Sequence, residues 1–192
     1  MRDIFLIPNL LTVSRIILVF PAIYYLDGGI YDIALYIILF VFLSDFLDGI
    51  IARKFGMTSY IGSILDPIAD KIVVISLFTY LLFVNRVNLL YYLLIITRDI
   101  SQLMSIPVLL LWKKIHFHVK PKLLPKWGTA LNFTLLGLVG LSVPFPKLNS
   151  YVGYVYLLYF LYTISGLIEI YILSTYIPRF IEIYQGNHNT FE

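Results

Sequence analysis

The residues best placed to do chemistry are four aspartates embedded in apolar sequence: Asp45, Asp48, Asp66 and Asp70. An ionised carboxylate at membrane depth costs roughly 2.5–3.5 kcal/mol on insertion scales unless a cation or hydrogen bonds compensate it. Four such costs in one short segment require a compensating partner. A divalent metal is the favoured partner, because all-oxygen ligation suits hard cations such as Mg²⁺ or Mn²⁺.

The spacing of these aspartates places each pair on one helix face. Asp45 and Asp48 are i,i+3 neighbours, and Asp66 and Asp70 are i,i+4 neighbours. Two antiparallel helices joined by a short loop would bring the four carboxylates around one cavity. Two metal ions about 3.5–4 Å apart can stabilise both the attacking and the leaving oxygen of a phosphoryl displacement. The pattern therefore predicts phosphoryl transfer with two Mg²⁺ or Mn²⁺ ions.

Small and polar residues around the aspartates fit a ligand that contains phosphate. Gly49, Ala52 and Gly62 leave the helix faces bare, which lets a ligand approach the backbone closely. Arg53 offers a planar guanidinium to phosphate oxygens, and Ser59 adds a polar contact in the loop. As an alternative, the acids could be solvated helix ends and Arg53 an ordinary basic flank. Acids inside a membrane are functional by default, so the combined pattern favours a site.

The composition of the 192-residue chain is that of a membrane protein. Apolar residues make up 60% of it, charged residues make up 13%, and the mean hydropathy is +0.88. The net charge of +3 could indicate nucleic acid, but the basic residues cluster beside apolar segments. An anionic lipid bilayer is therefore the expected partner, and no nucleic acid is expected. The absence of Cys excludes thiol catalysis and disulfides.

Six apolar segments predict six transmembrane helices and an all-α polytopic membrane fold. Each segment is near the ~20 residues that a helix needs to cross the hydrocarbon core. Their approximate ranges are 8–26, 31–52, 63–84, 88–112, 128–146 and 150–177. No repeat or low-complexity tract interrupts them, so residues 1–192 are expected to form a single membrane domain. No removable signal peptide is expected.

The distribution of Lys and Arg predicts the orientation of these spans. With the N-terminus inside, nine basic residues fall in the cytoplasmic segments: Arg2, Arg53, Lys54, Lys113, Lys114, Lys120, Lys122, Lys126 and Arg179. The outer loops would hold only two, Arg86 and Lys147. Both termini are therefore predicted to be cytoplasmic. The expected location is the cell membrane, with a multi-pass chain and an active site that faces the cytoplasm.

The pattern D-x2-D-G-x2-A-R-x8-G-x3-D-x3-D closely resembles the signature of the CDP-alcohol phosphatidyltransferase family and matches all eight fixed positions. The resemblance implies that the first three aspartates hold two divalent metals, and that Asp70 joins the second metal and serves as the base. The N-terminal IPNLLTVSR resembles the short interfacial helix of bacterial members. The CDP contacts implied in this way are Pro8, Asn9, Leu11, Thr12, Gly49, Ala52, Arg53, Ser59 and Gly62.

The resemblance also implies a reaction and a set of partners. The donor would be CDP-diacylglycerol, and Asp70 would take a proton from an acceptor alcohol. The acceptor oxygen would then attack the phosphorus that bears the diacylglycerol, and CMP would leave. A homodimer is implied as well, although the residues themselves give no signal for one.

The acceptor predicted from the resemblance is glycerol 3-phosphate. IPNLLTVSRI, LDPIADK and Arg98-Asp99 are similar to family members that use this acceptor. An anionic acceptor needs cationic partners, and the candidates are Arg98 and Lys126. However, VKPKLLPKWGTALN also resembles members that join CDP-diacylglycerol to phosphatidylglycerol and so make cardiolipin. An inositol phosphate is a third choice.

Two hypotheses from other classes remain open on the sequence alone. A divalent-cation transporter would also carry intramembrane acids, but it would spread them across membrane depth. A non-catalytic lipid or nucleotide binder would have no use for a base. Glu169, within the last apolar segment, is expected either to cap a polar network with a neighbouring helix or to line a dimer interface, and a structural role is favoured over a catalytic one. Gly137, Gly140 and Gly166 are expected to allow close helix packing.

Overall fold

The computed structural model describes residues 6–54, 60–107, 118–119, 123–185 and 190–191. The chain divides into two compact units, Met1–Val84 and Asn85–Glu192. Helices make up nearly all of the described residues in both units, so the predicted all-α class is confirmed. One α-helix of the described residues overlaps each of the six predicted apolar segments.

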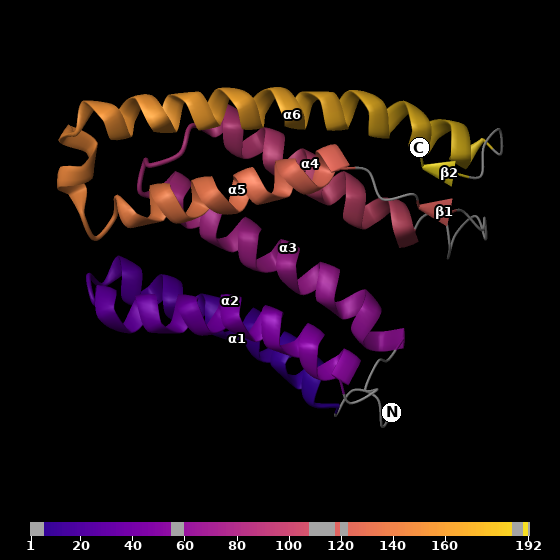
Figure 1. Cartoon of the computed structure of the whole chain (residues 1–192), viewed down its shortest axis with the longest axis horizontal. Coiled ribbons are helices and arrows are strands. Elements are labelled where there is room, and N and C mark those ends of the chain that lie inside the picture. The colour runs from indigo at the N-terminus through magenta and orange to yellow at the C-terminus, as the bar shows by residue number, and fades with distance from the viewer. Residues whose placement is uncertain (1–5, 55–59, 108–117, 120–122, 186–189, 192) are drawn as a thin grey trace. The chain divides into compact units, whose positions relative to one another are not determined.

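The first unit consists of α1 (Ile7–Asp27), α2 (Tyr31–Lys54) and α3 (Tyr60–Phe83) (Figure 1). Pro8 lies in the first turn of α1, where its missing N–H group costs no helical hydrogen bond. A tight turn joins α1 to α2. Within it Gly29 has φ 73°, a left-handed conformation that glycine adopts without steric cost. The Ile30 N–H group closes the turn by donating to the Tyr25 carbonyl oxygen at 2.9 Å.

Helix α1 packs against both α2 and α3. Three alanines, Ala22, Ala34 and Ala69, are fully buried on α1, α2 and α3. Side chains this small let neighbouring helix backbones approach closely. As a result, polar residues near the start of α1 can contact residues on both of the other helices.

The second unit consists of α4 (Leu89–Pro107), α5 (Leu123–Leu141), the short 3₁₀ helix η3 (Pro146–Ser150) and α6 (Val152–Tyr184) (Figure 1). Helix α6 packs against α4 and α5. Two strands of two residues each, β1 (His118–Val119) and β2 (Thr190–Phe191), pair in parallel. These strands are a small departure from the expected all-helical chain.

Several helix boundaries differ from the predicted ones. Helix α5 begins at Leu123 rather than at 128, since Pro125 is tolerated in its first turn. It ends at Leu141 rather than at 146, because Pro144 and Pro146 cannot continue a helix. IPNLLTVSR forms the first part of α1 and not a separate short interfacial helix. No helix-breaking residue separates it from the apolar sequence that follows.

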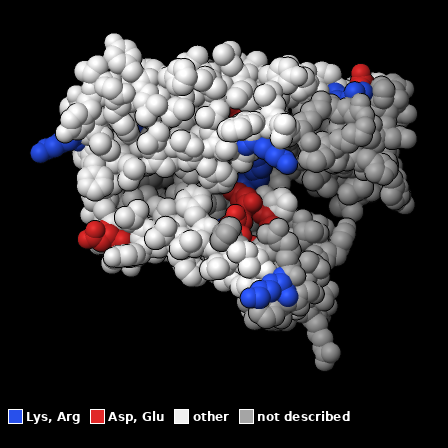
Figure 2. Space-filling model, viewed as in Figure 1, with Lys and Arg blue, Asp and Glu red and all other residues white. Residues whose placement is uncertain are grey.

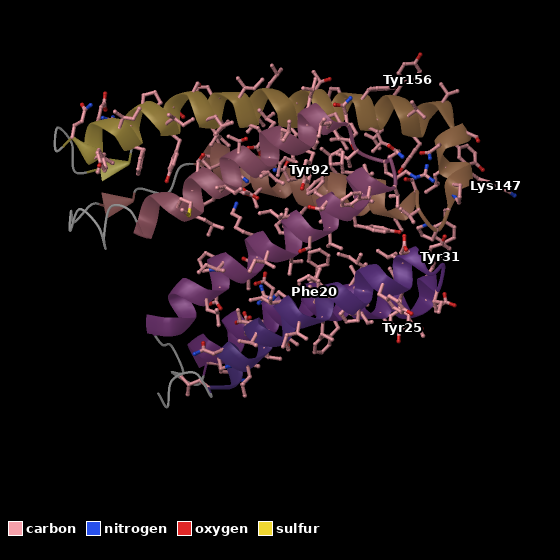
Figure 3. All side chains as sticks on the ribbon, turned by 180° about the vertical axis from the view of Figure 1, so that it is seen from behind. Phe20, Tyr25, Tyr31, Tyr92, Lys147 and Tyr156 are labelled. Atoms are coloured by element: carbon pink, nitrogen blue, oxygen red, sulfur yellow. The ribbon has the colours of Figure 1, made fainter. Side chains whose placement is uncertain are left out.

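Among the described residues, two helices are long and apolar enough to cross a membrane, at Pro8–Asp27 and Val152–Tyr184. The prediction of six spans therefore remains a prediction. Large apolar side chains are nevertheless exposed, for example Phe20 at 60% and Tyr156 at 70%, and Tyr156 points outward from α6 (Figure 3). Figure 2 shows that few charged side chains interrupt the described surface on the face in view. A surface of this kind indicates a membrane protein.

Candidate functional site

Arg15 of α1 lies at the centre of the aspartate cluster in the first unit. It is 2% exposed. Its Nη1 group donates to Asp45 Oδ1 at 2.6 Å and also to Asp70 Oδ1, and its Nη2 group donates to Asp48 Oδ2. One guanidinium on α1 therefore joins two carboxylates of α2 to one carboxylate of α3.

Thr12, one helical turn before Arg15, brings the fourth aspartate into the same cluster. Its hydroxyl oxygen lies 2.8 Å from Asp66 Oδ1, 3.3 Å from Asp48 Oδ2 and 3.0 Å from the Pro8 carbonyl oxygen. A hydroxyl has one hydrogen and can donate to only one of these acceptors at a time. The shortest distance is to Asp66. Thr12 and Arg15 together thus connect all four predicted aspartates.

The cluster is closed on one side and open on another. The side chains of Asp45 and Asp70 are 51% and 41% exposed, whereas that of Asp48 is 6% exposed. Arg15 lies on the buried side with Asp48. A ligand could therefore reach carboxylate oxygens of Asp45 and Asp70 while the buried groups hold the cluster together.

The donor chemistry of the cluster fits divalent metal ions. All four aspartates offer hard oxygen ligands, and Arg15 balances only one of their four negative charges when all are ionised. Within the described residues, no three His, Cys, Asp or Glu side chains are arranged so that they could hold a metal ion. Three of the four carboxylates instead contact the Arg15 guanidinium.

The predicted CDP contacts fall into two groups. On α1, Pro8, Asn9 and Thr12 are buried and Leu11 is half-buried, and at the start of α3 Gly62 is buried. The second group is not described in full. Gly49, Ala52 and Arg53 belong to α2, but their side chains lie outside the described part of the chain, and Ser59 lies outside the described residues altogether.

Arg98 of α4, a predicted acceptor contact, is buried within the second unit and bonded to neighbouring side chains. Its Nη1 group donates to Asp99 Oδ1 at 2.8 Å, and its Nη2 group donates to Thr129 Oγ1 at 3.0 Å. Its Nε atom lies 3.3 Å from Glu169 Oε2. Lys126, the other predicted acceptor contact, is exposed near the start of α5.

Glu169 of α6 belongs to an extended buried network, in line with its expected structural role. Asn132 Nδ2 donates to Glu169 Oε1 at 2.8 Å. The hydroxyls of Tyr91 and Ser165 donate to Asn132 Oδ1 at 3.0 Å and 2.7 Å. This network connects α4, α5 and α6.

Arg15 is the residue of the cluster that the sequence analysis missed. A signal for it was present, because an arginine in the middle of an apolar span is costly unless an acid compensates it. The residues that compensate Arg15 are 30 to 55 positions away in the chain, and linear spacing does not reveal them.

Known proteins similar to this chain include some named as CDP-diacylglycerol–glycerol-3-phosphate 3-phosphatidyltransferases and others named as cardiolipin synthases. The chain is 36% identical over 139 residues to CDP-diacylglycerol–glycerol-3-phosphate 3-phosphatidyltransferase of Aquifex aeolicus, covering 71% of this chain and 75% of that protein. A protein of Rickettsia felis with the same name is 38% identical over 98 residues, 48% of this chain and 53% of the relative. A cardiolipin synthase (CMP-forming)/mitochondrial hydrolase fusion protein of Schizosaccharomyces pombe is 37% identical over 156 residues, 72% of this chain but 26% of the fusion protein.

The family profile of the CDP-alcohol phosphatidyltransferases matches residues 5–170. That range includes all four aspartates, together with Arg15 and Thr12. The chain belongs to the CDP-alcohol phosphatidyltransferase family.

Proposed function

We propose that this protein transfers a phosphatidyl group from CDP-diacylglycerol to glycerol 3-phosphate and releases CMP, the reaction of phosphatidylglycerophosphate synthesis. The observation that carries the proposal is the convergence of Asp45, Asp48, Asp66 and Asp70 on Arg15 and Thr12 in a chain of this family. Family membership also favours a transferase over the cation transporter and the non-catalytic binder.

Two Mg²⁺ or Mn²⁺ ions are proposed as cofactors, held by the four aspartates. The support is the donor set itself, which is all oxygen and carries more negative charge than Arg15 balances. When bound, such ions would neutralise the negative charge of the diphosphate and of the reaction's transition state.

Asp70 is proposed as the general base. Its side chain is 41% exposed, so an acceptor hydroxyl can reach a carboxylate oxygen of Asp70. As the bond forms between the acceptor oxygen and the phosphorus that bears the diacylglycerol, the hydroxyl proton passes to Asp70. The bond from this phosphorus to the CMP oxygen breaks, and CMP leaves with that electron pair. Thr12 stays within hydrogen-bonding distance of Asp66 and Asp48 and so helps to orient both carboxylates.

The side chains on α1 are proposed to contribute to the CDP site. Pro8, Asn9 and Thr12 are buried close to the start of that helix, and Thr12 lies within hydrogen-bonding distance of Asp66. Leu11, Gly49, Ala52, Arg53, Ser59 and Gly62 complete the proposed set. Arg53 would pair with phosphate oxygens.

Glycerol 3-phosphate is proposed as the acceptor because relatives named for that activity include the Aquifex aeolicus protein, of which the match covers 75%. Lys126 supplies an exposed cation for a phosphate dianion, and Arg98 remains the second proposed contact. Cardiolipin synthesis from phosphatidylglycerol is the second candidate, favoured by relatives with that name. In either case the proposed setting is the cell membrane, with six spans, cytoplasmic termini and a cytoplasmic active site, and a homodimer stays a prediction.

An acceptor panel tests this proposal. Purified protein is given CDP-diacylglycerol and Mg²⁺ or Mn²⁺ together with glycerol 3-phosphate, phosphatidylglycerol, inositol phosphate or serine, and the lipid product and CMP are measured. Phosphatidylglycerophosphate as the main product supports the proposal. Cardiolipin as the main product would replace it with the second candidate, and CMP release that persists in excess EDTA would refute the metal requirement.

A further inference from the structure

The Arg15 guanidinium occupies carboxylate oxygens that the proposed function assigns to metal ions. It contacts Asp45 Oδ1, Asp70 Oδ1 and Asp48 Oδ2, and the residue is 2% exposed. Its Nε–H group is also buried, and no hydrogen-bond acceptor for that group is found among the described residues. The buried arginine is therefore held almost entirely by these carboxylates.

A guanidinium and a divalent cation compete for such oxygens. Both need the same lone pairs, and two cations a few ångströms apart repel each other strongly at the low effective dielectric constant of a partly buried site. With Arg15 withdrawn, three carboxylates would each regain an oxygen for ligation. With Arg15 in place, the aspartates of α2 and α3 are held together without any metal.

We propose that Arg15 is an exchangeable counter-ion: it holds Asp45, Asp48 and Asp70 together in the metal-free protein and releases their oxygens when divalent cations bind. This inference rests on the proposed function, since it takes the aspartates as metal ligands. Arg15 is then a positioning residue that opposes metal binding. In the metal-free protein its positive charge reduces the repulsion between the carboxylates.

The opposite role for Arg15 makes a different prediction. If its contacts are permanent and only orient the aspartates as ligands, removal of the guanidinium disorders the metal site and weakens metal binding. If Arg15 competes with the metal, removal strengthens metal binding while it destabilises the metal-free protein. The direction of the change in metal affinity separates the two roles.

The experiment measures Mn²⁺ affinity of the full-length protein in detergent by electron paramagnetic resonance and calorimetry. Arg15→Gln should bind Mn²⁺ at least about tenfold more tightly than the wild type. In this variant the metal does not have to displace the charge-assisted hydrogen bonds that the Arg15 guanidinium donates to the carboxylates. Arg15→Lys keeps the charge but not the planar fork, so its affinity should lie between the two. Arg179→Gln is the matched control. Arg179 pairs with Glu182 at 2.9 Å within α6, and its loss should leave Mn²⁺ affinity unchanged.

Unfolding temperature provides a second measurement. In EDTA, Arg15→Gln should unfold at a lower temperature than the wild type, and saturating Mn²⁺ should remove most of that difference, since a ligand of the native state stabilises it. If Arg15→Gln cannot be purified in either condition, Arg15→Lys decides the matter. A Mn²⁺ affinity above that of the wild type supports exchange, and one equal to it or below it overturns exchange.

The outcomes distinguish failure of this inference from failure of the proposed function. If the wild type binds Mn²⁺ and Arg15→Gln binds it no more tightly, exchange is overturned while the metal-dependent transferase stands. If the wild type binds no Mn²⁺, both exchange and the proposed metal requirement are overturned. Phosphatidyl transfer by the wild type is scored separately in the acceptor panel.

Discussion

Each of the two units buries an arginine among acids, but the two arrangements differ. Arg15 in the first unit contacts three aspartates, and Thr12 connects the fourth, Asp66, to the same cluster. The side chains of Asp45 and Asp70 are 51% and 41% exposed. Arg98 in the second unit lies beside Asp99 and Glu169, whose side chains are only 2% and 0% exposed. Neutral groups complete the second network.

The difference in exposure of the acids indicates a ligand site around Arg15 and a structural network around Arg98. Around Arg15, acid exceeds base and part of the acid is open, so incoming cations and substrate can still gain contacts there. Around Arg98, hydrogen bonds to Thr129 and from Asn132 to Glu169 satisfy buried groups within the protein. Removal of one partner of a buried, hydrogen-bonded ion pair strongly destabilises the folded protein. Substitutions in the Arg15 cluster should therefore act first on catalysis, and substitutions in the Arg98 network should act first on stability.

The largest expected effect comes from removing a proposed metal ligand. Asp45→Asn and Asp66→Asn should each lower phosphatidyl transfer to the uncatalysed background, because the loss of one carboxylate leaves shared metal charge under-compensated. Mn²⁺ affinity should fall in both variants. Transfer is measured as CMP release and lipid product, and binding by electron paramagnetic resonance.

Asp32→Asn is the matched control for these two variants. Asp32 is exposed in the first turn of α2, on the same helix as Asp45 but outside the cluster. It should keep wild-type transfer and Mn²⁺ binding. If Asp32→Asn loses as much transfer and Mn²⁺ binding as the two cluster variants, the losses reflect a general effect of removing an aspartate. The cluster would then not differ from the rest of the first unit.

Substitution of the proposed base should separate turnover from binding. Asp70→Asn should keep CDP-diacylglycerol binding but lower kcat by about 10²–10⁴-fold, the usual contribution of general base catalysis. Binding is measured with the isolated lipid and kcat at saturating acceptor. A variant that binds the donor poorly but turns over normally at saturation would make Asp70 a binding residue.

In the second unit, truncation of the buried arginine should act on stability. Arg98→Ala leaves Asp99 and Glu169 buried without this cation, and removal of one partner of a buried ion pair costs about 3–5 kcal/mol. Arg179→Ala removes a more exposed pair with Glu182, and such surface pairs contribute about 0–1 kcal/mol. Denaturant unfolding in detergent measures both. Similar losses would show that the Arg98 network contributes no more than a surface pair.

The sequence predicted the helices and the grouping of the four aspartates because both depend on local pattern, while the role of those aspartates as metal ligands stays a prediction. Six apolar segments correspond to six helices, and the i,i+3 and i,i+4 spacing placed each aspartate pair on one helix face. Contacts between helices are not local. The involvement of Arg15 and Thr12 depends on how α1 packs against α2 and α3, and no spacing within the signature encodes that.

The same limit explains an error of prediction at three glycines. Gly137, Gly140 and Gly166 were expected at close helix contacts, but a Cβ at any of them would meet no atom of the described residues within 4 Å. Which glycine lies at a contact depends on the rotation of the helix about its axis, and apolar sequence on all sides of a helix does not define that rotation.

A smaller effect is expected at the exposed proposed acceptor contact. Lys126→Ala should raise the KM for glycerol 3-phosphate about tenfold, because a charge-assisted contact contributes roughly 1.5–3 kcal/mol. The KM for CDP-diacylglycerol should change little. Lys147→Ala, also exposed but in the segment between α5 and α6, is the control. If the acceptor KM is unchanged in Lys126→Ala, or phosphatidylglycerol is the better acceptor, the cardiolipin synthase hypothesis gains support.

The smallest expected effect concerns the packing beside the Arg98 network. A Cβ at Gly128 would lie 3.1 Å from Ile168 Cγ2, 3.2 Å from Ile172 Cδ1 and 3.4 Å from Glu169 Oε1, so α5 and α6 approach closely there. Gly128→Ala gains about 1 kcal/mol of helix propensity but overpacks a tight contact at a cost of about 1–3 kcal/mol. Gly166→Ala gains the same propensity in open space. We therefore expect Gly128→Ala to be less stable than Gly166→Ala by about 1–3 kcal/mol in denaturant unfolding, while CMP release by both stays near the wild-type level. Equal stability of the two variants would mean that α5 and α6 are not tightly packed at this network.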